Sequence, residues 1–171
     1  NRLQQIARRF SKIGSLPQKE WVDVNWVVSE VVTYFRARLP KSKEVNLNVD
    51  YGGLPQIKAN SELLQWVFEN LIRNSIDAMD KTVGQINLRL AYDSTKRLIN
   101  ILYSDNGKGI GRKDRRKIFN PGMTTKNHGW GLGLTLAKRI IEEYHNGRIR
   151  LLHTNTSGTT FEIQIPVSQS K

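Results

Sequence analysis

Apolar and polar positions recur along the chain with two spacings, and these spacings predict both helices and strands. Apolar residues three and four apart predict helices at 1–13, 25–39 and 65–79 and a last helix that ends near His145. Residues of alternating character predict strands at 21–24, 45–49, 85–91, 98–103, 148–152 and 160–165. This order predicts a two-layer α/β (α+β) sandwich, in which a mixed, largely antiparallel sheet packs against helices. The expected helix caps are Asn25 for the second helix and Asn60 or Ser61 for the third.

The helix at 65–79 carries a row of polar side chains along one edge of its apolar face. Asn70, Asn74 and Asp77 lie at i, i+4 and i+7. The apolar face itself is formed by Leu64, Phe68, Leu71, Ile72, Ile76 and Met79. Asparagine is a poor helix former because its side chain competes for backbone hydrogen bonds. The row is either an ordinary polar helix edge or the wall of a cleft that holds a polar ligand such as a metal-bound phosphate.

Two glycine-rich segments follow. The first, Asp105-Asn106-Gly107-Lys108-Gly109-Ile110, comes directly after an apolar strand. It predicts either a simple turn or a loop whose backbone approaches a flat ligand, with Asp105 accepting a hydrogen bond from an exocyclic amino group.

The second glycine-rich segment, 129–134, opens a helix and reads GWGLGL. It is neither a P-loop nor a dinucleotide fingerprint, because no Gly-Lys-Ser/Thr follows and no strand precedes it. Backbone N–H groups at a helix start favour phosphate, and a glycine hinge without a ligand is the alternative. The residues between the two segments, at 119–126, predict a loop whose hydroxyls and ammonium suit a mobile lid over phosphates.

Composition limits the class of protein. The chain has 171 residues, 38% hydrophobic and 25% charged, without cysteine; it fits a globular domain in a reducing compartment such as the cytoplasm. No segment has the pattern of a membrane span or a signal peptide. The net charge of +12 favours anionic partners, but no basic stripe carries interleaved aromatic residues, so nucleic acid is not expected. The basic run at 112–117 is either a contact for an acidic partner or a solvated surface.

In this order, the segments resemble the ATP-binding domain of sensor histidine kinases, in the gyrase/Hsp90/histidine-kinase/MutL ATPase superfamily. The resemblance covers about 20–167 and rests on ENLIRNSIDA, DNGKGI, IFNPGMTTK and GWGLGL, with a closing glycine box at 158–161. It implies a Bergerat-type fold, a catalytic and ATP-binding domain at 17–171, and at 1–16 the end of a dimerisation helix plus a linker. Two places depart from the family: Asp77-Ala78 replaces a lysine and an aromatic residue, and Gly122 replaces a second phenylalanine.

The resemblance also implies roles for individual residues. Asn74 would ligate Mg²⁺, Asn70 would face the phosphates, and Asp105 would bind the adenine amino group. Asn70 and Lys126 are the residues expected to serve catalysis. Further nucleotide contacts are expected from Asp77, Gly107, Gly109, Ile110, Phe119, Thr124, Thr125, Lys126, Gly129, Gly131, Leu132, Gly133, Leu134, Thr159 and Thr160.

The implied activity is transfer of the γ-phosphoryl group of Mg-ATP to a histidine. Hydrolysing branches of the superfamily commonly have a glutamate base where Asn70 stands, and an amide cannot act as a base. The alternatives are an ATPase that uses nucleotide as a conformational clamp and a nucleotide-free interaction module. None of His128, His145 and His153 has the context of an acceptor, so we expect the acceptor upstream of Asn1. The expected partners are ATP, the dimerisation and phosphoacceptor helix of a homodimeric, possibly membrane-anchored parent kinase, and its response regulator.

Overall fold

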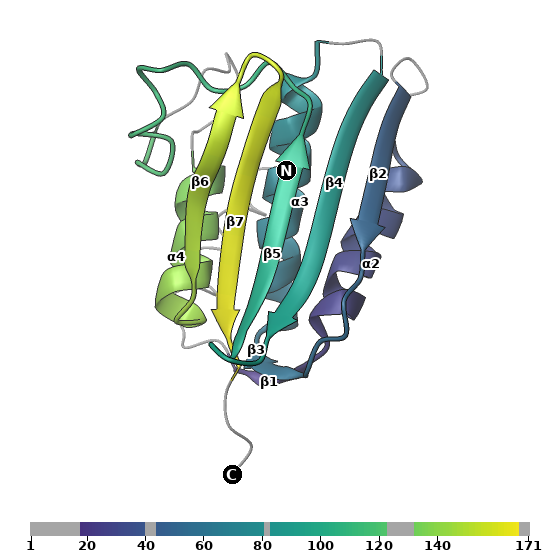
Figure 1. Cartoon of the computed structure of the whole chain (residues 1–171), viewed down its shortest axis with the longest axis vertical. Coiled ribbons are helices and arrows are strands. Elements are labelled where there is room, and N and C mark those ends of the chain that lie inside the picture. The colour runs from purple at the N-terminus through teal and green to yellow at the C-terminus, as the bar shows by residue number, and fades with distance from the viewer. Residues whose placement is uncertain (1–17, 40–43, 81–82, 123–131, 168–171) are drawn as a thin grey trace, which may run out of the picture.

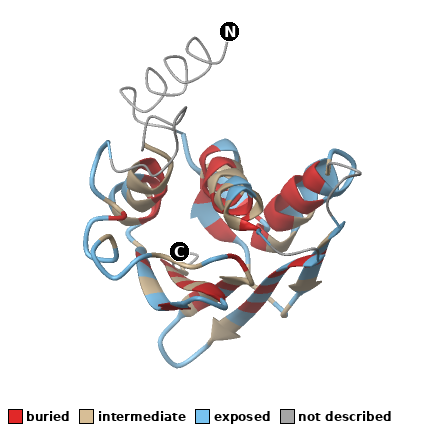
Figure 2. Cartoon of the chain, turned by 90° about the horizontal axis from the view of Figure 1, so that it is seen from above, coloured by how far each residue is buried: buried red, intermediate tan, exposed pale blue. Residues whose placement is uncertain are grey.

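The computed structural model describes residues 18–39, 44–80, 83–122 and 132–167, which form two layers. One layer is a five-stranded sheet, and the helices cover one of its faces (Figures 1 and 2). Across the sheet the strands are β2 (Glu44–Asp50), β4 (Val83–Asp93), β5 (Leu98–Asp105), β7 (Gly158–Pro166) and β6 (Arg148–Asn155). Strands β2 and β4 are parallel and the other pairs are antiparallel. The predicted two-layer sandwich with a mixed, largely antiparallel sheet is confirmed.

The helical layer consists of α2 (Val24–Arg36), α3 (Ser61–Ala78) and α4 (Gly133–Arg139). Their buried sides face the sheet (Figure 2). A short antiparallel pair, β1 (Glu20–Val22) with β3 (Ile57–Ala59), lies at one end of the molecule (Figure 1). Large, fully buried side chains come from α3 and the inner face of the sheet: Leu64, Phe68, Leu71, Ile72, Ile86, Leu88, Leu90, Ile99, Ile101 and Tyr103. Each is worth about 1.5–3 kcal/mol of burial, so α3 is held firmly against the strands.

The caps of two helices were predicted with different success. Asn60 caps α3 as expected, because its Oδ1 accepts the Leu63 N–H at 2.9 Å. The prediction of Asn25 as the cap of α2 was wrong. Asp23 is the cap and accepts the N–H groups of residues 25 and 26, while the Asn25 side chain donates to the Gly52 carbonyl at 2.9 Å. That helix also ends at Arg36, before the predicted residue 39.

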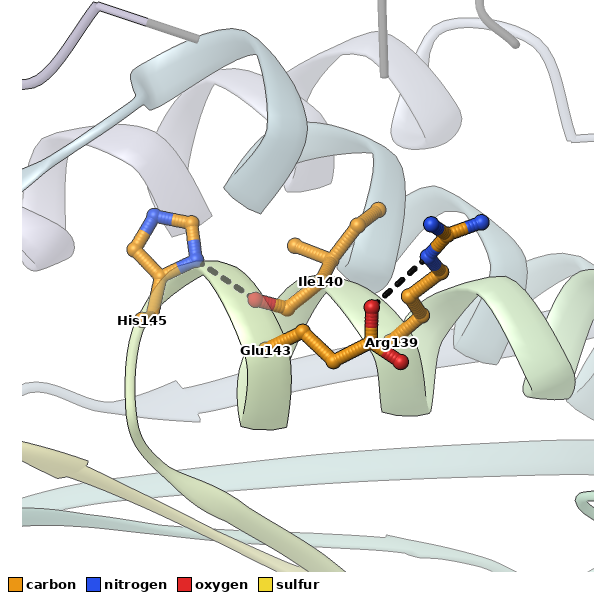
Figure 3. Close-up of polar contacts among 4 residues, drawn as sticks. All are labelled: Arg139, Ile140, Glu143 and His145. Carbon is orange, nitrogen blue, oxygen red and sulfur yellow. Dashed lines mark hydrogen bonds and ion pairs between the residues drawn. The ribbon is translucent and has the colours of Figure 1, made fainter. Parts of the chain in front are cut away.

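The last helix ends in a π-helical turn, η1 (Ile140–Tyr144), near the predicted His145. Nδ1 of His145 lies 2.8 Å from the Ile140 carbonyl oxygen (Figure 3), and Nε2 accepts the Asn60 backbone N–H at 3.1 Å. Both contacts are satisfied by the neutral ring with its proton on Nδ1. Burial lowers the pKa of His145, which therefore stays neutral and ties the end of this helix to the start of α3.

Some predictions concern residues that the structure does not describe. The helix expected at 1–13 and the proposed boundary between 1–16 and 17–171 fall outside the described part of the chain. Among the described helices, none combines the length and the apolar character needed to cross a membrane.

Candidate functional site

Asp105 is the last residue of β5, and the alternation of the strand turns its side chain towards the helices. Two groups hold the carboxylate. Oδ2 accepts the hydroxyl of Ser75 at 2.5 Å, and Oδ1 accepts the backbone N–H of Gly107 at 2.9 Å. The carboxylate is therefore fixed between α3 and the glycine loop that follows it.

Ser75 has a second partner, which the sequence analysis missed together with Ser75 itself. The Tyr103 hydroxyl lies 2.8 Å from Ser75 Oγ, two residues before Asp105 on the same face of β5. Tyr103 is fully buried, and this burial raises its pKa well above the usual value, so its hydroxyl keeps its proton. Two features of the sequence could have revealed this contact. Positions 103 and 105 are two apart and so lie on the same face of a strand, and a serine interrupts the apolar stretch of α3.

The loop after β5 is attached at several points. Asn106 binds the start of β4, accepting the Gln85 N–H at 2.7 Å and donating to the Val83 carbonyl at 3.1 Å. Gly109 has φ +75, and a Cβ there would overlap the carbonyl oxygen of Asn155. At Gly109 the backbone approaches the protein's own β6–β7 turn, whereas the approach of this loop to a flat ligand stays a prediction.

The opposite wall comes from β6 and β7. Thr154 Oγ1 accepts the Ile110 N–H at 2.9 Å and lies 3.1 Å from Thr159 Oγ1. In the strand register, Thr159 is directly opposite Asp105. A β-bulge between Leu151 and His153 shifts the pairing of β6 before Thr154.

Phe119 packs next to this wall. Its ring meets that of Phe161 edge to face at 6.3 Å between centroids, and the Lys138 ammonium lies 5.3 Å from its centroid. The predicted anchoring of this loop by Phe119 has a physical basis in these two contacts.

The amide edge of α3 faces the start of α4. Asn70 and Asn74 are half-buried, whereas Asp77 is exposed nearer the end of the helix. Nδ2 of Asn70 donates to the Trp66 carbonyl at 3.0 Å. Gly133, the first residue of α4, lies so close that a Cβ there would be 2.9 Å from Asn70 Oδ1. Gly133 and Asn70 are therefore neighbours, although they are about sixty residues apart in sequence.

Other predicted residues occupy different places. Leu132 and Leu134 flank Gly133 at the start of α4 and pack on the core. Thr160 is not brought to the site: it pairs with Ser104 on the outer face of the sheet, where both line a hollow of about 410 Å³. The remaining predicted contacts lie outside the described residues: Thr124, Thr125, Lys126, Gly129 and Gly131.

The side chains at this site suit a metal ion that is already bound to phosphates better than they suit a free metal ion. In the described ranges, no three His, Cys, Asp or Glu side chains gather into a metal-binding group. Mg²⁺ usually takes only one or two protein oxygens and fills its other positions with phosphate oxygens and water. The amide oxygen of Asn74 at the edge of α3 is a suitable ligand of this kind.

Comparison with known proteins agrees with this arrangement. The sequence profile of the family "Histidine kinase-, DNA gyrase B-, and HSP90-like ATPase" matches residues 59–169. The histidine-protein kinase AtoS of Escherichia coli is 32% identical over 90% of this chain and 29% of its own length. The sensor histidine kinase ZraS of Salmonella typhimurium is 36% identical over 74% of this chain and 27% of its own length. The chain thus spans less than a third of either relative.

Solved structures show the same fold. The catalytic domain of the histidine kinase ThkA superposes with a TM-score of 0.75 and 25% identity, covering 88% of this chain and 96% of that domain. ThkA was also solved in complex with the response regulator protein TrrA. The chain belongs to the family of histidine kinase-, DNA gyrase B- and HSP90-like ATPases, and it carries the ATP-binding catalytic domain of sensor histidine kinases.

Proposed function

We propose that this domain binds Mg-ATP between the inner face of the sheet and helices α3 and α4, and presents the γ-phosphoryl group to a histidine. The observation that carries the proposal is the juxtaposition of a fixed carboxylate with an amide-lined helix edge. Asp105 lies at one end of α3, and Asn70 and Asn74 lie along the same helix towards the start of α4.

The adenine binds at Asp105 in this proposal. A carboxylate accepts hydrogen bonds only, and the exocyclic amino group of adenine is a donor. Such a charge-assisted bond contributes about 1.5–3 kcal/mol. The glycine loop at 107–110 closes this end of the site, and Ile110 is held there by Thr154.

The phosphates lie along the amide edge of α3. Asn74 holds Mg²⁺, which neutralises charge on the phosphate oxygens when it is bound. Asn70 faces the phosphates beside Gly133, and the N–H groups at the start of α4 add a favourable dipole. From the lid we assign Thr124, Thr125, Lys126, Gly129 and Gly131 to the same phosphates.

The acceptor histidine is supplied from outside this site. His145 is buried, and both ring nitrogens have hydrogen-bond partners. His153 pairs with Thr160 on the outer face of the sheet, away from Asp105. We assign the acceptor to a dimerisation helix of a homodimeric parent kinase that acts in the cytoplasm and passes the phosphoryl group to a response regulator, in line with the complex of ThkA.

Calorimetry with MgATP tests the proposal. The chain is expected to bind MgATP, and Asn74→Ala is expected to weaken binding in Mg²⁺ while leaving binding in EDTA nearly unchanged. Equal losses in both buffers would contradict the metal role of Asn74. No heat at millimolar MgATP would contradict the proposed function itself.

A turnover assay tests separately whether ATP hydrolysis, rather than phosphoryl transfer, is the main activity. The amide of Asn70 cannot activate water as a base, which favours phosphoryl transfer. Steady ATP hydrolysis that is strongly reduced in Glu69→Ala would instead assign the chain to the hydrolysing branches of the family.

A further inference from the structure

A chain of hydroxyl groups runs from the core of the protein to the candidate adenine contact. Tyr103 is fully buried beneath α3, its hydroxyl lies 2.8 Å from Ser75 Oγ, and Ser75 Oγ lies 2.5 Å from Asp105 Oδ2. Ser75 is also buried, with 2% of its surface exposed. The described structure therefore gives both hydroxyls a defined place inside the protein.

The direction of the hydrogen bonds follows from the acceptor at the end. A carboxylate can only accept, so the single proton of the Ser75 hydroxyl points to Asp105. Ser75 Oγ then has only lone pairs to offer Tyr103, and the Tyr103 hydroxyl must donate to it. Each bond in such a chain polarises the next, because the surroundings have a low dielectric constant.

We propose that Tyr103 and Ser75 are positioning residues, which orient the Asp105 carboxylate for the exocyclic amino group of the nucleotide base. This inference rests on the proposed function. Rotation of a carboxylate about its last side-chain torsion has a broad, shallow energy profile. Ser75 on Oδ2 and Gly107 on Oδ1 fix that rotation at two points and leave the remaining lone pairs for the ligand.

Loss of the Tyr103 hydroxyl removes the hydrogen bond that Ser75 Oγ accepts, so the Ser75 hydroxyl rotates more freely. The Ser75 donor to Asp105 is then less polarised and less firmly oriented, while the Gly107 N–H stays in place. The contact with the amino group weakens, whereas contacts with the phosphates and the ribose are unchanged. The two residues thus contribute to the choice of base rather than to nucleotide affinity in general.

The test compares ATP with purine riboside triphosphate, which lacks the amino group. Dissociation constants with Mg²⁺ are measured by calorimetry for the wild type, Tyr103→Phe and Ser75→Ala, with the exposed Tyr34→Phe as control. We expect each positioning variant to lose about 3- to 10-fold in affinity for ATP but less than about 2-fold for the analogue. The preference for ATP therefore falls in both variants and persists in the control.

Three results would overturn the inference: equal losses for the two ligands, unchanged preference in both variants, or a wild type that binds ATP and the analogue equally. A wild type that binds neither ligand would instead contradict the proposed function. Thermal unfolding without nucleotide shows whether each variant is folded. If one variant does not fold, the other decides, since each removes a different oxygen of the same chain. In the double variant, the losses are expected to be less than additive.

Discussion

The two faces of the sheet differ sharply, although they are built from adjacent residues of the same strands. The inner face presents Asp105, Thr159 and Thr154 to the helices, and the outer face presents Ser104, Thr160 and His153 one position away. Inner side chains are joined by hydrogen bonds at 2.5–3.1 Å among buried and half-buried groups. The period of two in a strand therefore decides which polar residues take part in the candidate site.

Burial explains the difference in what each face can do. Helices cover only the inner face (Figure 2), so polar groups there interact in a low dielectric and in fixed positions. The outer face carries exposed ion pairs, such as Arg89 with Asp50 at 3.4 Å and Arg150 with Glu162. Water competes with such pairs, so the exact geometry of each pair contributes little to stability.

The largest expected effect is that of Gly158→Ala, at the start of β7. Gly158 has φ +147, and a Cβ would overlap the carbonyl oxygen of Asp105. We expect a loss of about 3 kcal/mol or more in the free energy of unfolding, measured by denaturant titration. Gly53→Ala is the control, because no atom lies within 4 Å of a Cβ there. Similar small losses in both variants would show that the β6–β7 turn does not constrain Asp105.

Asp105→Asn is expected to have the next largest effect, on binding. With its Oδ1 on the Gly107 N–H, the amide places its NH2 group against Ser75, whose hydroxyl must reverse to accept, and the charged acceptor for the amino group of the base is lost. We expect affinity for MgATP to fall about 10-fold or more by calorimetry. Asp50→Asn on the exposed edge strand is the matched control and should bind normally. Equal affinity in the two variants would remove Asp105 from the nucleotide contact.

A smaller effect is expected from pH. Burial lowers the pKa of His145 in the folded state, so the unfolded state binds the proton more readily. The free energy of unfolding should be flat above the unfolded pKa of about 6.5 and should fall as the pH drops below it. His145→Gln should lose about 1 kcal/mol at pH 7 and flatten this dependence. A profile unchanged by His145→Gln would assign the dependence to another group.

The smallest effect is expected from Arg89→Ala, which removes an ion pair of the outer face. Its side chain is 73% exposed and that of Asp50 is 72% exposed. The free energy of unfolding should change by less than about 0.5 kcal/mol, and affinity for MgATP should not change. A clear loss of nucleotide affinity would show that the outer face is coupled to the site.

The sequence predicted the structure best where a motif coincides with the regular spacing of residues in a helix or a strand. Asn70 and Asn74 lie on one helix edge as predicted, whereas Asp105, predicted to follow a strand at 98–103, is the last residue of that strand. Thr160 was grouped with Thr159 because motifs are read in one dimension, whereas the strand turns these neighbours to opposite faces. Ser75 and Tyr103 were missed because their contact depends on how α3 is placed over β5, which no local pattern encodes. Asn25 was wrongly predicted as a cap because Asp23, the true cap two residues earlier, is an equally good capping residue type.

The β-bulge in β6 has a consequence for the chemistry of the wall beside Asp105. Before the bulge Leu151 is opposite Phe161, and after it His153 is opposite Thr160. Leu152 is the extra residue; if it were instead paired with Thr160 in a regular ladder, His153 would lie across from Thr159 on the inner side. A regular ladder of the same residues would thus place an imidazole where the Thr154 hydroxyl now stands at this wall. The unpaired Leu152, which is exposed to solvent, thus keeps the Thr154 hydroxyl rather than the His153 imidazole on the inner side of this wall.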